Sequence, residues 1–314
     1  MTNTSSSIDP AVVAAELLTV RDFIRHAVSS FNAGKLYFGH GTTTAFDEAV
    51  FMVLEGLNLP IDQLEPYLDA RLTAGERKHL ADLIDQRVRT RKPASYLTKR
   101  AYIQGIPFHV DERVIVPRSF IGELLFSDLF GGDGFTLVDN PYEVNSVLDL
   151  CTGSGCLAIL AAHLFPNAQV DAVDLSPDAL EVARKNVEES GMGDRITLFH
   201  GDLFAPLKGR HYDLIITNPP YVDAETMALL PPEFRHEPEM ALAGGPDGLD
   251  IVRRILLEAP RHMTPNGGLL CEIGTDREIL ESEFDLPFFW LDTANSSGEV
   301  FWLTREQMSE GDGL

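Results

Sequence analysis

The stretch Asp213-Leu-Ile-Ile-Thr-Asn-Pro-Pro-Tyr221 decides the fold of this 314-residue chain. Residues Leu214 to Thr217 are apolar or β-branched, which predicts a buried strand. The two prolines that follow cannot donate to a sheet ladder, and the residue before a proline avoids the helical region. The backbone is therefore expected to leave the sheet in an extended form at the carboxyl end of the strand, where open α/β sheets bind their ligands.

Residues Asn218 to Tyr221 carry an unusual set of groups for a turn. The Asn218 side-chain oxygen and the Pro219 carbonyl can both accept hydrogen bonds, and Pro219 has no N–H. Two adjacent acceptors suit a planar –NH2 group, which has two hydrogens to donate, and the Tyr221 ring can lie against a planar amide or base. An ordinary proline turn after a core strand is the alternative, but it gives no reason for the asparagine and the tyrosine.

From residue 146 onward the sequence alternates between strand and helix patterns. Strands are expected at 147–151, 169–174, 195–200, 212–217 and 269–273, and helices at 157–165, 177–190, 248–257 and 275–283. Such alternation predicts a parallel, doubly wound α/β sheet. Two further strands, 288–292 and 299–304, are joined by residues 295–298 and predict a closing hairpin.

The preceding residues follow a different pattern. Apolar residues recur at helical spacing over residues 10–31, a second helix is expected after Thr44, and Thr73 to Glu76 form a capping box that opens a third, which Pro93 ends. Between Ala101 and Pro117, short apolar segments that include residues 114–116 predict a hairpin, followed by a helix from Ser119 to about residue 130. The sequence therefore divides into parts at 1–93, 94–118 and 119–314.

Composition limits the class of partner. The chain has 25 Lys and Arg against 48 Asp and Glu, a net charge of −23, so stable nucleic-acid binding is not expected and a basic protein partner is favoured. The three cysteines have no C-x-x-C spacing and predict reduced thiols, with no disulfide frame and no metal site. No signal-peptide pattern or bilayer-length apolar run is present, so we expect a cytoplasmic protein without membrane contact.

A glycine-rich stretch, Asp149-Leu-Cys-Thr-Gly153-Ser-Gly155, leaves one predicted strand and opens a helix. Glycines there let a ligand approach the backbone closely. Asp174 ends the next strand, where an acid can bind ribose hydroxyls. The stretch also satisfies the G-x-G-x-x-A dinucleotide pattern, so a dehydrogenase remains an alternative. Asp149, however, would repel a pyrophosphate and suits the cationic amino-acid portion of S-adenosylmethionine.

The motifs together resemble those of the protein-glutamine methyltransferases, a class I family that uses S-adenosylmethionine. The resemblance includes Val114-Ile-Val-Pro-Arg118-Ser119 and runs along nearly the whole chain. Segments 38–41, 47–50, 69–72, 96–98 and 110–119 are similar to the branch that methylates a glutamine on the third protein of the large ribosomal subunit. The sister branch, which acts on release factors, more often has Pro-Arg-Pro at residues 117–119.

The resemblance implies a seven-stranded, Rossmann-like methyltransferase domain at 119–314, a hairpin connector at 94–118 and a helical substrate-recognition domain at 1–93. It implies S-adenosylmethionine as cofactor, S-adenosylhomocysteine as product, no metal, and a basic ribosomal protein as partner. Asn218, Pro219 and Tyr221 would act in catalysis and, with Pro220 and Arg118, would bind the substrate. The expected cofactor contacts are Asp149, Cys151, Thr152, Gly153, Ser154, Gly155, Asp174, Leu175, Asp202, Leu203 and Asn218.

Two related activities remain alternatives at this point. Methylation of release factors shares all the chemistry and differs only in the partner. An adenine-directed nucleic-acid methyltransferase uses the same Asn-Pro-Pro-Tyr motif, but the net charge of −23 counts against it. Residues 237–248 predict either a glycine-hinged loop beside the substrate or a plain surface loop, and no role is assigned to residues 131–145.

Overall fold

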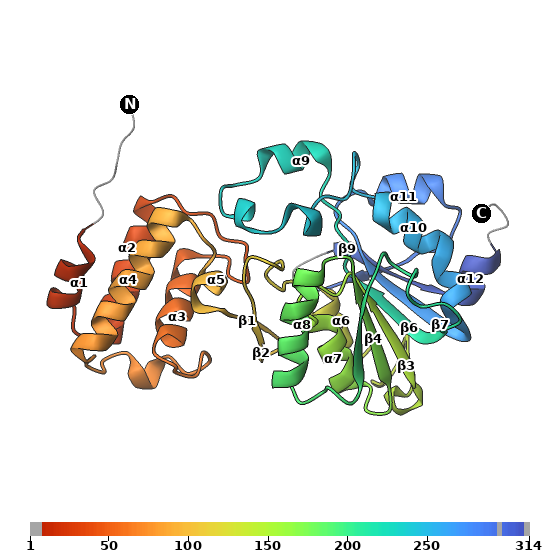
Figure 1. The fold of residues 1–314 in the computed structure, drawn as a ribbon, viewed down its shortest axis with the longest axis horizontal. Helices are drawn as coiled ribbons and strands as arrows, with labels where there is room; N and C mark the ends of the chain where they lie inside the picture. The colour runs from red at the N-terminus through yellow and green to blue at the C-terminus, as the bar shows by residue number, and fades with distance from the viewer. Residues whose placement is uncertain (1–7, 294–296, 311–314) are drawn as a thin grey trace. The chain divides into compact units, whose positions relative to one another are not determined.

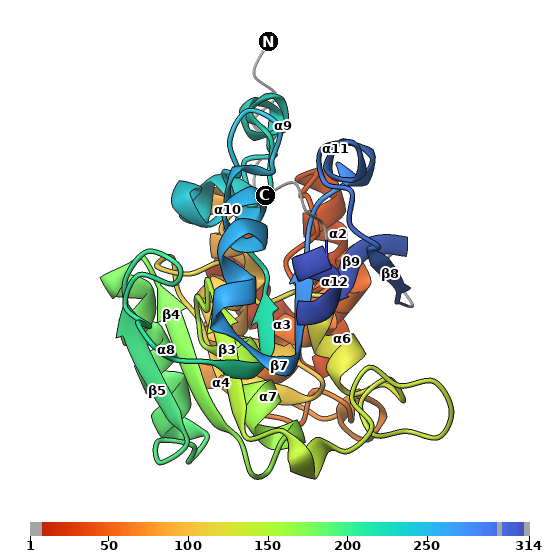
Figure 2. The ribbon, with the colours of Figure 1, turned by 90° about the vertical axis from the view of Figure 1, so that its right-hand side faces the viewer.

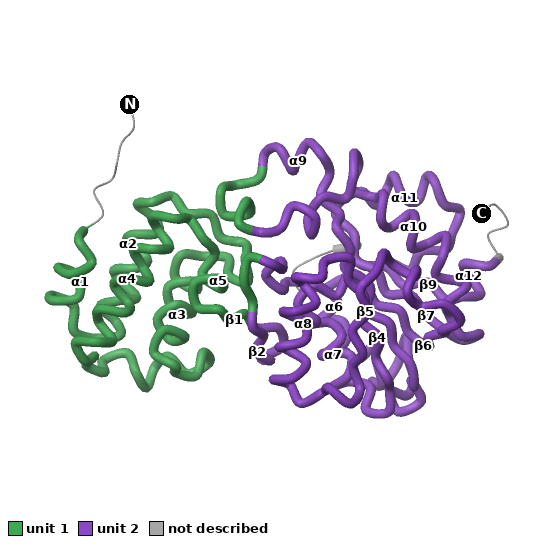
Figure 3. The backbone as a smooth tube through the Cα atoms, in the orientation of Figure 1, with its two compact units in different colours: residues 1–101, 110–112, 230–236 green, residues 102–109, 113–229, 237–314 purple. Residues whose placement is uncertain are grey.

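The computed structural model describes residues 8–293 and 297–310 (Figure 1). Residues 1–7, and Asn295 and Ser296 of the predicted closing turn, lie outside the described residues. The chain divides into two compact units (Figure 3). Unit 1 comprises Met1–Ala101, Val110–Glu112 and Leu230–His236, and unit 2 comprises Tyr102–His109, Arg113–Leu229 and Glu237–Leu314. Unit 1 is therefore discontinuous in sequence.

Unit 1 is helical. It contains α1 (Pro10–Glu16), α2 (Val20–Ala33), α3 (Ala45–Gly56), the 3-10 helix η1 (Glu65–Tyr67), α4 (Ala74–Thr90) and α5 (Ala94–Thr98). The prediction of one helix over 10–31 is wrong, because Thr19 and Asp22 form a capping box that starts α2 as a separate helix. The cap by Thr44 and the capping box of Thr73 and Glu76 are confirmed.

A buried ion cluster lies inside unit 1, which is otherwise filled by apolar side chains of α2, α3 and α4. The guanidinium of Arg87 is 2.7 Å from the Glu48 carboxylate, and both side chains are buried. The segment Leu230–His236 adds Glu233, which accepts from the backbone N–H of Tyr37 at 3.0 Å and lies 2.8 Å from Arg91. Charges buried this deeply are stable only when they are paired, so this remote segment is needed to complete unit 1.

A short two-stranded sheet precedes the large sheet of unit 2. It consists of β1 (Arg100–Ile103) and β2 (Ile106–His109). Residues 114–116, expected to be a strand, are not one: the Val116 N–H donates instead to the carboxylate of Glu237 at 2.9 Å. The helix predicted from Ser119 to about residue 130 is also shorter, and α6 spans Ile121–Leu125.

The large sheet has seven strands in the order β5-β4-β3-β6-β7-β9-β8, which Figure 2 shows from left to right. Their bounds are β3 (Ser146–Leu150), β4 (Gln169–Asp174), β5 (Ile196–His200), β6 (Tyr212–Thr217), β7 (Met263–Glu272), β8 (Phe289–Asp292) and β9 (Ser297–Thr304). The first five strands in this order are parallel, and β9 pairs antiparallel with both β7 and β8. The predicted doubly wound sheet with a closing antiparallel pair is confirmed.

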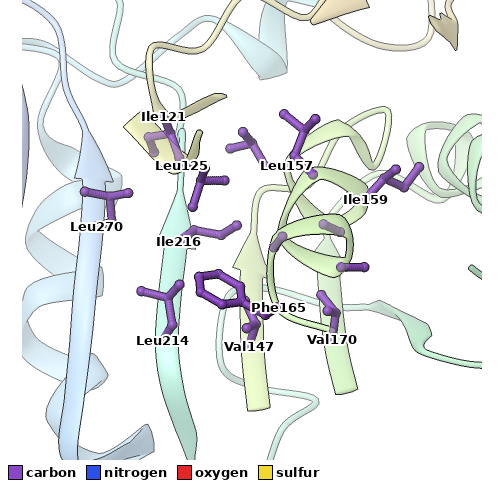
Figure 4. Packing of buried hydrophobic residues seen from close by; sticks show 14 of the residues in the cluster. Ile121, Leu125, Val147, Leu157, Ile159, Phe165, Val170, Leu214, Ile216 and Leu270 are labelled. Carbon is purple, nitrogen blue, oxygen red and sulfur yellow. The ribbon is translucent and has the colours of Figure 1, made fainter. Parts of the chain in front are cut away.

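Helices cover both faces of this sheet. The first apolar cluster joins strand residues such as Val147 and Ile216 to α6, α7 (Cys156–Leu164) and α8 (Pro177–Glu189), as Figure 4 shows for the side chains around Phe165. The second cluster joins Leu148 and Leu150 to α10 (Asp250–Glu258), α11 (Arg277–Glu283) and α12 (Arg305–Glu310). Successive residues of β3 thus point to opposite faces, as a strand requires. The remaining helices of the described residues are α9 (Ala224–Leu229), η2 (Pro141–Glu143), η3 (Phe234–His236), η4 (Glu239–Ala241) and η5 (Ala259–His262).

Candidate active site

The strand register brings the predicted site stretches to one edge of the sheet. Leu150 at the end of β3 pairs with Thr217 of β6 on one side and with Val173 of β4 on the other. Asp174 at the end of β4 pairs in turn with His200 at the end of β5. Because these strands are parallel, the segments that follow them all leave at the carboxyl edge, where ligands of doubly wound sheets bind.

The segment after β3 has a backbone suited to close approach by a ligand. Cys151, Gly153 and Gly155 have positive φ values of 58°, 54° and 78°, a conformation that is strained for the cysteine. A Cβ atom at Gly155 would lie 3.2 Å from the Ala183 Cβ, so glycine is needed there for packing against α8. A Cβ atom at Gly153 would have no described atom within 4 Å, so this glycine presents open backbone at the edge of the sheet.

Asp149 is a fully buried carboxyl group with one unused oxygen. Its Oδ2 accepts from the Thr152 hydroxyl and from the Ala158 N–H, the latter at 3.0 Å. Its Oδ1 is buried and accepts no hydrogen bond from any residue in the described ranges. Burial raises the pKa of Asp149 to about 7. The ammonium group of a methionine-like cofactor would supply both the missing partner and a positive charge, so the residue fits the predicted cofactor.

Asp174 ties the ends of β3 and β4 together. Its carboxylate accepts from the Gly153 N–H and from the Ser176 N–H, both at 2.8 Å, and burial raises its pKa above the ordinary value. Each carboxylate oxygen keeps a further lone pair for a ribose hydroxyl. The neighbouring Leu175 side chain is 54% exposed, which offers an apolar surface beside that carboxylate. The pair therefore suits a ribose that carries a flat base.

The segment after β5 carries Asp202 and Leu203, whose predicted contacts with the cofactor stay a prediction. Leu203 has a φ of 45° and a buried side chain, so the turn presents strained backbone at this edge. The carboxylate of Asp202 lies 2.8 Å from Arg254 of α10, so one of its oxygens is already engaged by a guanidinium. Thr152 and Ser154, which are also predicted to contact the cofactor, lie in a loop that is held by the protein's own hydrogen bonds. The Ser154 carbonyl accepts from the Asn186 side chain at 2.8 Å.

The Asn-Pro-Pro-Tyr segment begins where β6 is fixed to β3, since the Thr217 hydroxyl donates to the Leu150 carbonyl at 3.0 Å. Asn218 Oδ1 is buried and accepts no hydrogen bond from the part of the chain that the structure describes. Pro219 is buried and Pro220 is half-buried. An amide oxygen that is withdrawn from water costs free energy unless a donor reaches it, and such a donor is what the predicted substrate would bring.

Three glycines fix the backbone around Tyr221. A Cβ atom at Gly248 would lie 2.4 Å from the Tyr221 carbonyl oxygen, and one at Gly244 would lie 2.7 Å from its Cα atom. A Cβ atom at Gly274 would lie 3.2 Å from the tyrosine ring. The loop at residues 237–248 is therefore packed against the motif, with the Gly244 N–H donating to the Val222 carbonyl at 2.9 Å.

Arg118 points toward the protein's own chain. Its two terminal nitrogens lie 2.6 and 2.8 Å from the two oxygens of Glu237, and one of them also donates to the Val116 carbonyl at 3.1 Å. Glu237 is buried, so this fork-shaped pair is partly withdrawn from water. The geometry supports a role for Arg118 in holding the 237–248 loop, while the predicted contact with a substrate stays a prediction.

Sequence reasoning missed Glu272, a buried carboxyl group at the end of β7. It accepts from the Ser119 hydroxyl at 2.6 Å, from the Phe120 N–H at 2.9 Å and from the Tyr221 hydroxyl at 3.2 Å. Burial raises the pKa of Glu272 to about 7. A single acid at the end of an otherwise apolar strand was the available signal, because a charge in that position must have partners.

The cysteines are not poised for reaction. Burial is the main cause that raises the pKa of Cys151, Cys156 and Cys271, so all three are neutral thiols at physiological pH. Among residues 8–293 and 297–310, no group of three or more His, Cys, Asp or Glu side chains is placed to hold a metal ion. Within the same ranges, no helix has the length and apolar character needed to cross a bilayer.

The chain is similar to known methyltransferases. Residues 136–237 match the family model of the Methyltransferase small domain. Among solved structures, a methyltransferase from Pyrococcus furiosus aligns with a TM-score of 0.47 at 18% identity, over 65% of this chain and 90% of that one. The sheet order and the family match define a class I methyltransferase that uses S-adenosylmethionine.

The family within this class follows from close relatives. The ribosomal protein uL3 glutamine methyltransferase of Bradyrhizobium diazoefficiens is 62% identical over 296 residues, covering 93% of this chain and 92% of that protein. The proteins of the same name from Bordetella pertussis and Neisseria meningitidis are 55% and 54% identical, each over 94% of this chain and 97% and 96% of theirs. The chain belongs to the family of ribosomal protein uL3 glutamine methyltransferases. The resemblance stated from the sequence is confirmed, and a dinucleotide-dependent dehydrogenase is not supported.

Proposed function

We propose that the chain transfers a methyl group from S-adenosylmethionine to the side-chain amide nitrogen of a glutamine in uL3, the third protein of the large ribosomal subunit. The observation that carries this proposal is the buried, unpartnered Oδ1 of Asn218, adjacent to the Pro219 carbonyl at the carboxyl edge of the sheet. These two acceptors match the two hydrogens of a primary amide. The names of relatives that are 54–62% identical support uL3 as the protein that carries this amide.

The cofactor, when bound, supplies an electrophilic methyl group on a sulfonium centre. On the protein side, Asp149 Oδ1 would accept from the cofactor's ammonium group, and the backbone from Cys151 to Gly155 would line its amino-acid portion. Asp174 would bind the ribose hydroxyls, and Leu175 and Leu203 would contact the base.

The main barrier to this reaction is the weak nucleophilicity of an amide nitrogen, whose lone pair is delocalised into the carbonyl. Asn218 and Pro219 would hold both hydrogens and so orient the nitrogen toward the methyl group. Their oxygens would also stabilise the positive charge that develops on nitrogen, which is most effective in the transition state. The Tyr221 ring would lie against the amide plane. The methylated nitrogen is then acidic enough to lose its proton to water, so the mechanism requires no base from the chain.

The substrate side of the proposal concerns recognition. A net charge of −23 favours a basic protein over a nucleic-acid strand, and a ribosomal protein is basic in order to bind RNA. We place the first contacts with the folded part of that substrate on the helical residues 1–93, with 94–118 as the connector to the methyltransferase domain at 119–314. A ribosomal-protein substrate also supports the cytoplasm as the location.

The test is methyl transfer to purified candidates. The full chain is incubated with labelled S-adenosylmethionine and with uL3 or a release factor, and the labelled peptide is mapped by mass spectrometry. We expect label on one glutamine of uL3 and none on the release factor. Label on the release factor alone would move the chain to the sister activity, and label on neither protein would remove the proposed substrate.

A further inference from the structure

Glu272 connects two loops that are far apart in the sequence. It ends β7, the neighbour of β6, and its side chain is 1% exposed. Oε2 accepts from the Ser119 hydroxyl and the Phe120 N–H, which begin the turn after Arg118. Oε1 accepts from the hydroxyl of Tyr221, the last residue of the Asn-Pro-Pro-Tyr segment. One buried carboxyl group therefore fixes both the turn at residue 119 and the tyrosine.

These three contacts, in the direction in which they are made, suit the ionised form of Glu272. All three partners are donors, and a carboxylate is an acceptor with room for each of them. A protonated carboxyl group would keep these contacts only if the Tyr221 or the Ser119 hydroxyl reversed its hydrogen bond and accepted from Glu272, which would turn that hydroxyl away from its present orientation. The Ser119 hydroxyl also accepts from the Ile121 N–H at 3.2 Å, which leaves its own hydrogen free to point at Glu272.

The charged groups around this network are few. Arg118 and Glu299 act on the Tyr221 hydroxyl, and the charge of Arg118 is largely compensated by its fork-shaped pair with Glu237. Cys271, the preceding residue, is a buried neutral thiol. Tyr221 is the one titratable partner that donates to Glu272 in the described ranges, and burial raises its pKa, so Glu272 is the group of this pair that titrates near neutral pH.

We propose that Glu272 is a positioning residue, whose carboxylate holds the Tyr221 hydroxyl and the Ser119–Phe120 turn so that the tyrosine ring is fixed against the substrate amide. This inference rests on the proposed glutamine methylation and identifies what orients its aromatic contact. Glu272 touches neither the substrate nor the cofactor in this scheme, because its oxygens are occupied by the protein's own donors.

The pH dependence follows from the charge state. Burial raises the pKa of Glu272 to about 7, well above the ordinary value of 4.5, so the carboxylate form is present above pH 7 and is lost as the pH falls. Turnover at saturating cofactor should therefore decline below pH 7, approaching about tenfold per pH unit. Saturation removes the separate effect of Asp149, which acts on cofactor binding.

The test is a double-mutant cycle of Glu272→Gln and Tyr221→Phe in the full chain, with uL3 as substrate. Glutamine keeps the volume but removes the charge and turns an amide N–H2 toward a donor. We expect Glu272→Gln to lower kcat by about 10- to 100-fold and to leave the affinity for S-adenosylhomocysteine unchanged. It should also abolish the decline of turnover below pH 7, the acid limb of the pH profile. In the Tyr221→Phe background the same change should cost at least tenfold less, because the hydroxyl it acts through is gone.

The matched control is Glu278→Gln, the same substitution at an exposed position on α11, which should change nothing. If Glu272→Gln costs the same with or without the tyrosine hydroxyl, or if the acid limb persists in it, Glu272 does not act through Tyr221 and the inference fails. The Ser119→Ala variant keeps the test informative if Glu272→Gln unfolds: it removes one donor, and it too should shift the acid limb. A wild-type chain that methylates no uL3 at any pH refutes the proposed function instead.

Discussion

Replacing Asn218 by alanine should nearly abolish methyl transfer while leaving the fold intact. The Asn218 Oδ1 atom is buried and has no donor among the residues that the structure describes, so its removal breaks no hydrogen bond of the free protein. In the substrate complex, however, the same oxygen would hold one of the two amide hydrogens. Loss of one preorganised polar contact of this kind lowers kcat by about 100- to 1000-fold.

The two effects should separate in measurement. Turnover is measured as label transferred to uL3 at saturating cofactor, cofactor affinity by calorimetry with S-adenosylhomocysteine, and stability by urea unfolding. We expect Asn218→Ala to keep a nearly unchanged cofactor affinity and a free energy of unfolding within about 1 kcal/mol of the wild type. Asn218→Gln, which displaces the same amide by one methylene group, should also lose activity, because the effect depends on position.

The control is Asn32→Ala, an exposed asparagine near the end of α2, which should be neutral in all three assays. Turnover of Asn218→Ala within a few-fold of the wild type would remove Asn218 from the mechanism. A large fall in unfolding free energy would show that Asn218 has a structural partner, and would contradict the reasoning from its unpartnered oxygen.

Three further predictions follow from the site. Cofactor affinity should fall by up to about tenfold per pH unit below pH 7, because the pKa of Asp149 is raised to about 7 and only its carboxylate form attracts an ammonium group. Calorimetry at several pH values should show this dependence in the wild type and not in Asp149→Asn. Arg118→Lys should lower the free energy of unfolding by about 1–3 kcal/mol, because lysine cannot form the fork-shaped pair with Glu237. If Arg118→Lys loses uL3 methylation while Glu237→Gln keeps it, Arg118 contacts the substrate instead. Gly248→Ala should lower turnover by at least about tenfold, because its Cβ atom would lie 2.4 Å from the Tyr221 carbonyl oxygen. Gly209→Ala is the control, since Gly209 has a similar φ of 76° but its added Cβ atom would have no neighbour within 4 Å, and equal activity of the two variants would refute the steric argument.

The parts of the fold that the sequence predicts are those with local causes. The strand at 212–217 ends at two prolines, and the third helix begins at a capping box, so both have the expected bounds or nearly so. The break between α1 and α2 was also encoded locally, in the Thr19 to Asp22 box, but the apolar periodicity across it concealed it. The residues of the candidate site can be predicted because each motif comes directly after a strand. The order of the parallel strands alone then brings these motifs together at the carboxyl edge of the sheet.

The parts that could not be predicted depend on contacts between distant residues. Residues 114–116 have a strand-like composition, yet the Val116 N–H is bound by the carboxylate of Glu237, and no local pattern indicates this. The three donors to Glu272 are Ser119, Phe120 and Tyr221, and only the folded chain brings them to one carboxyl group. Likewise, no periodicity indicates that residues 230–236 belong to the helical unit.

That last feature has a bearing on biosynthesis and on protein engineering. Glu233 provides the carboxylate that Arg91 and the Tyr37 N–H contact, and the Phe234 ring lies 4.3 Å from that of His40. A nascent chain that has not yet been extended past residue 236 has Glu48 for Arg87 but lacks Glu233 for Arg91, so the buried ion cluster is completed only after most of the polypeptide has been made. A chimera that exchanges residues 1–93 alone would separate Arg91 from Glu233, and a faithful exchange must carry residues 230–236 along with it.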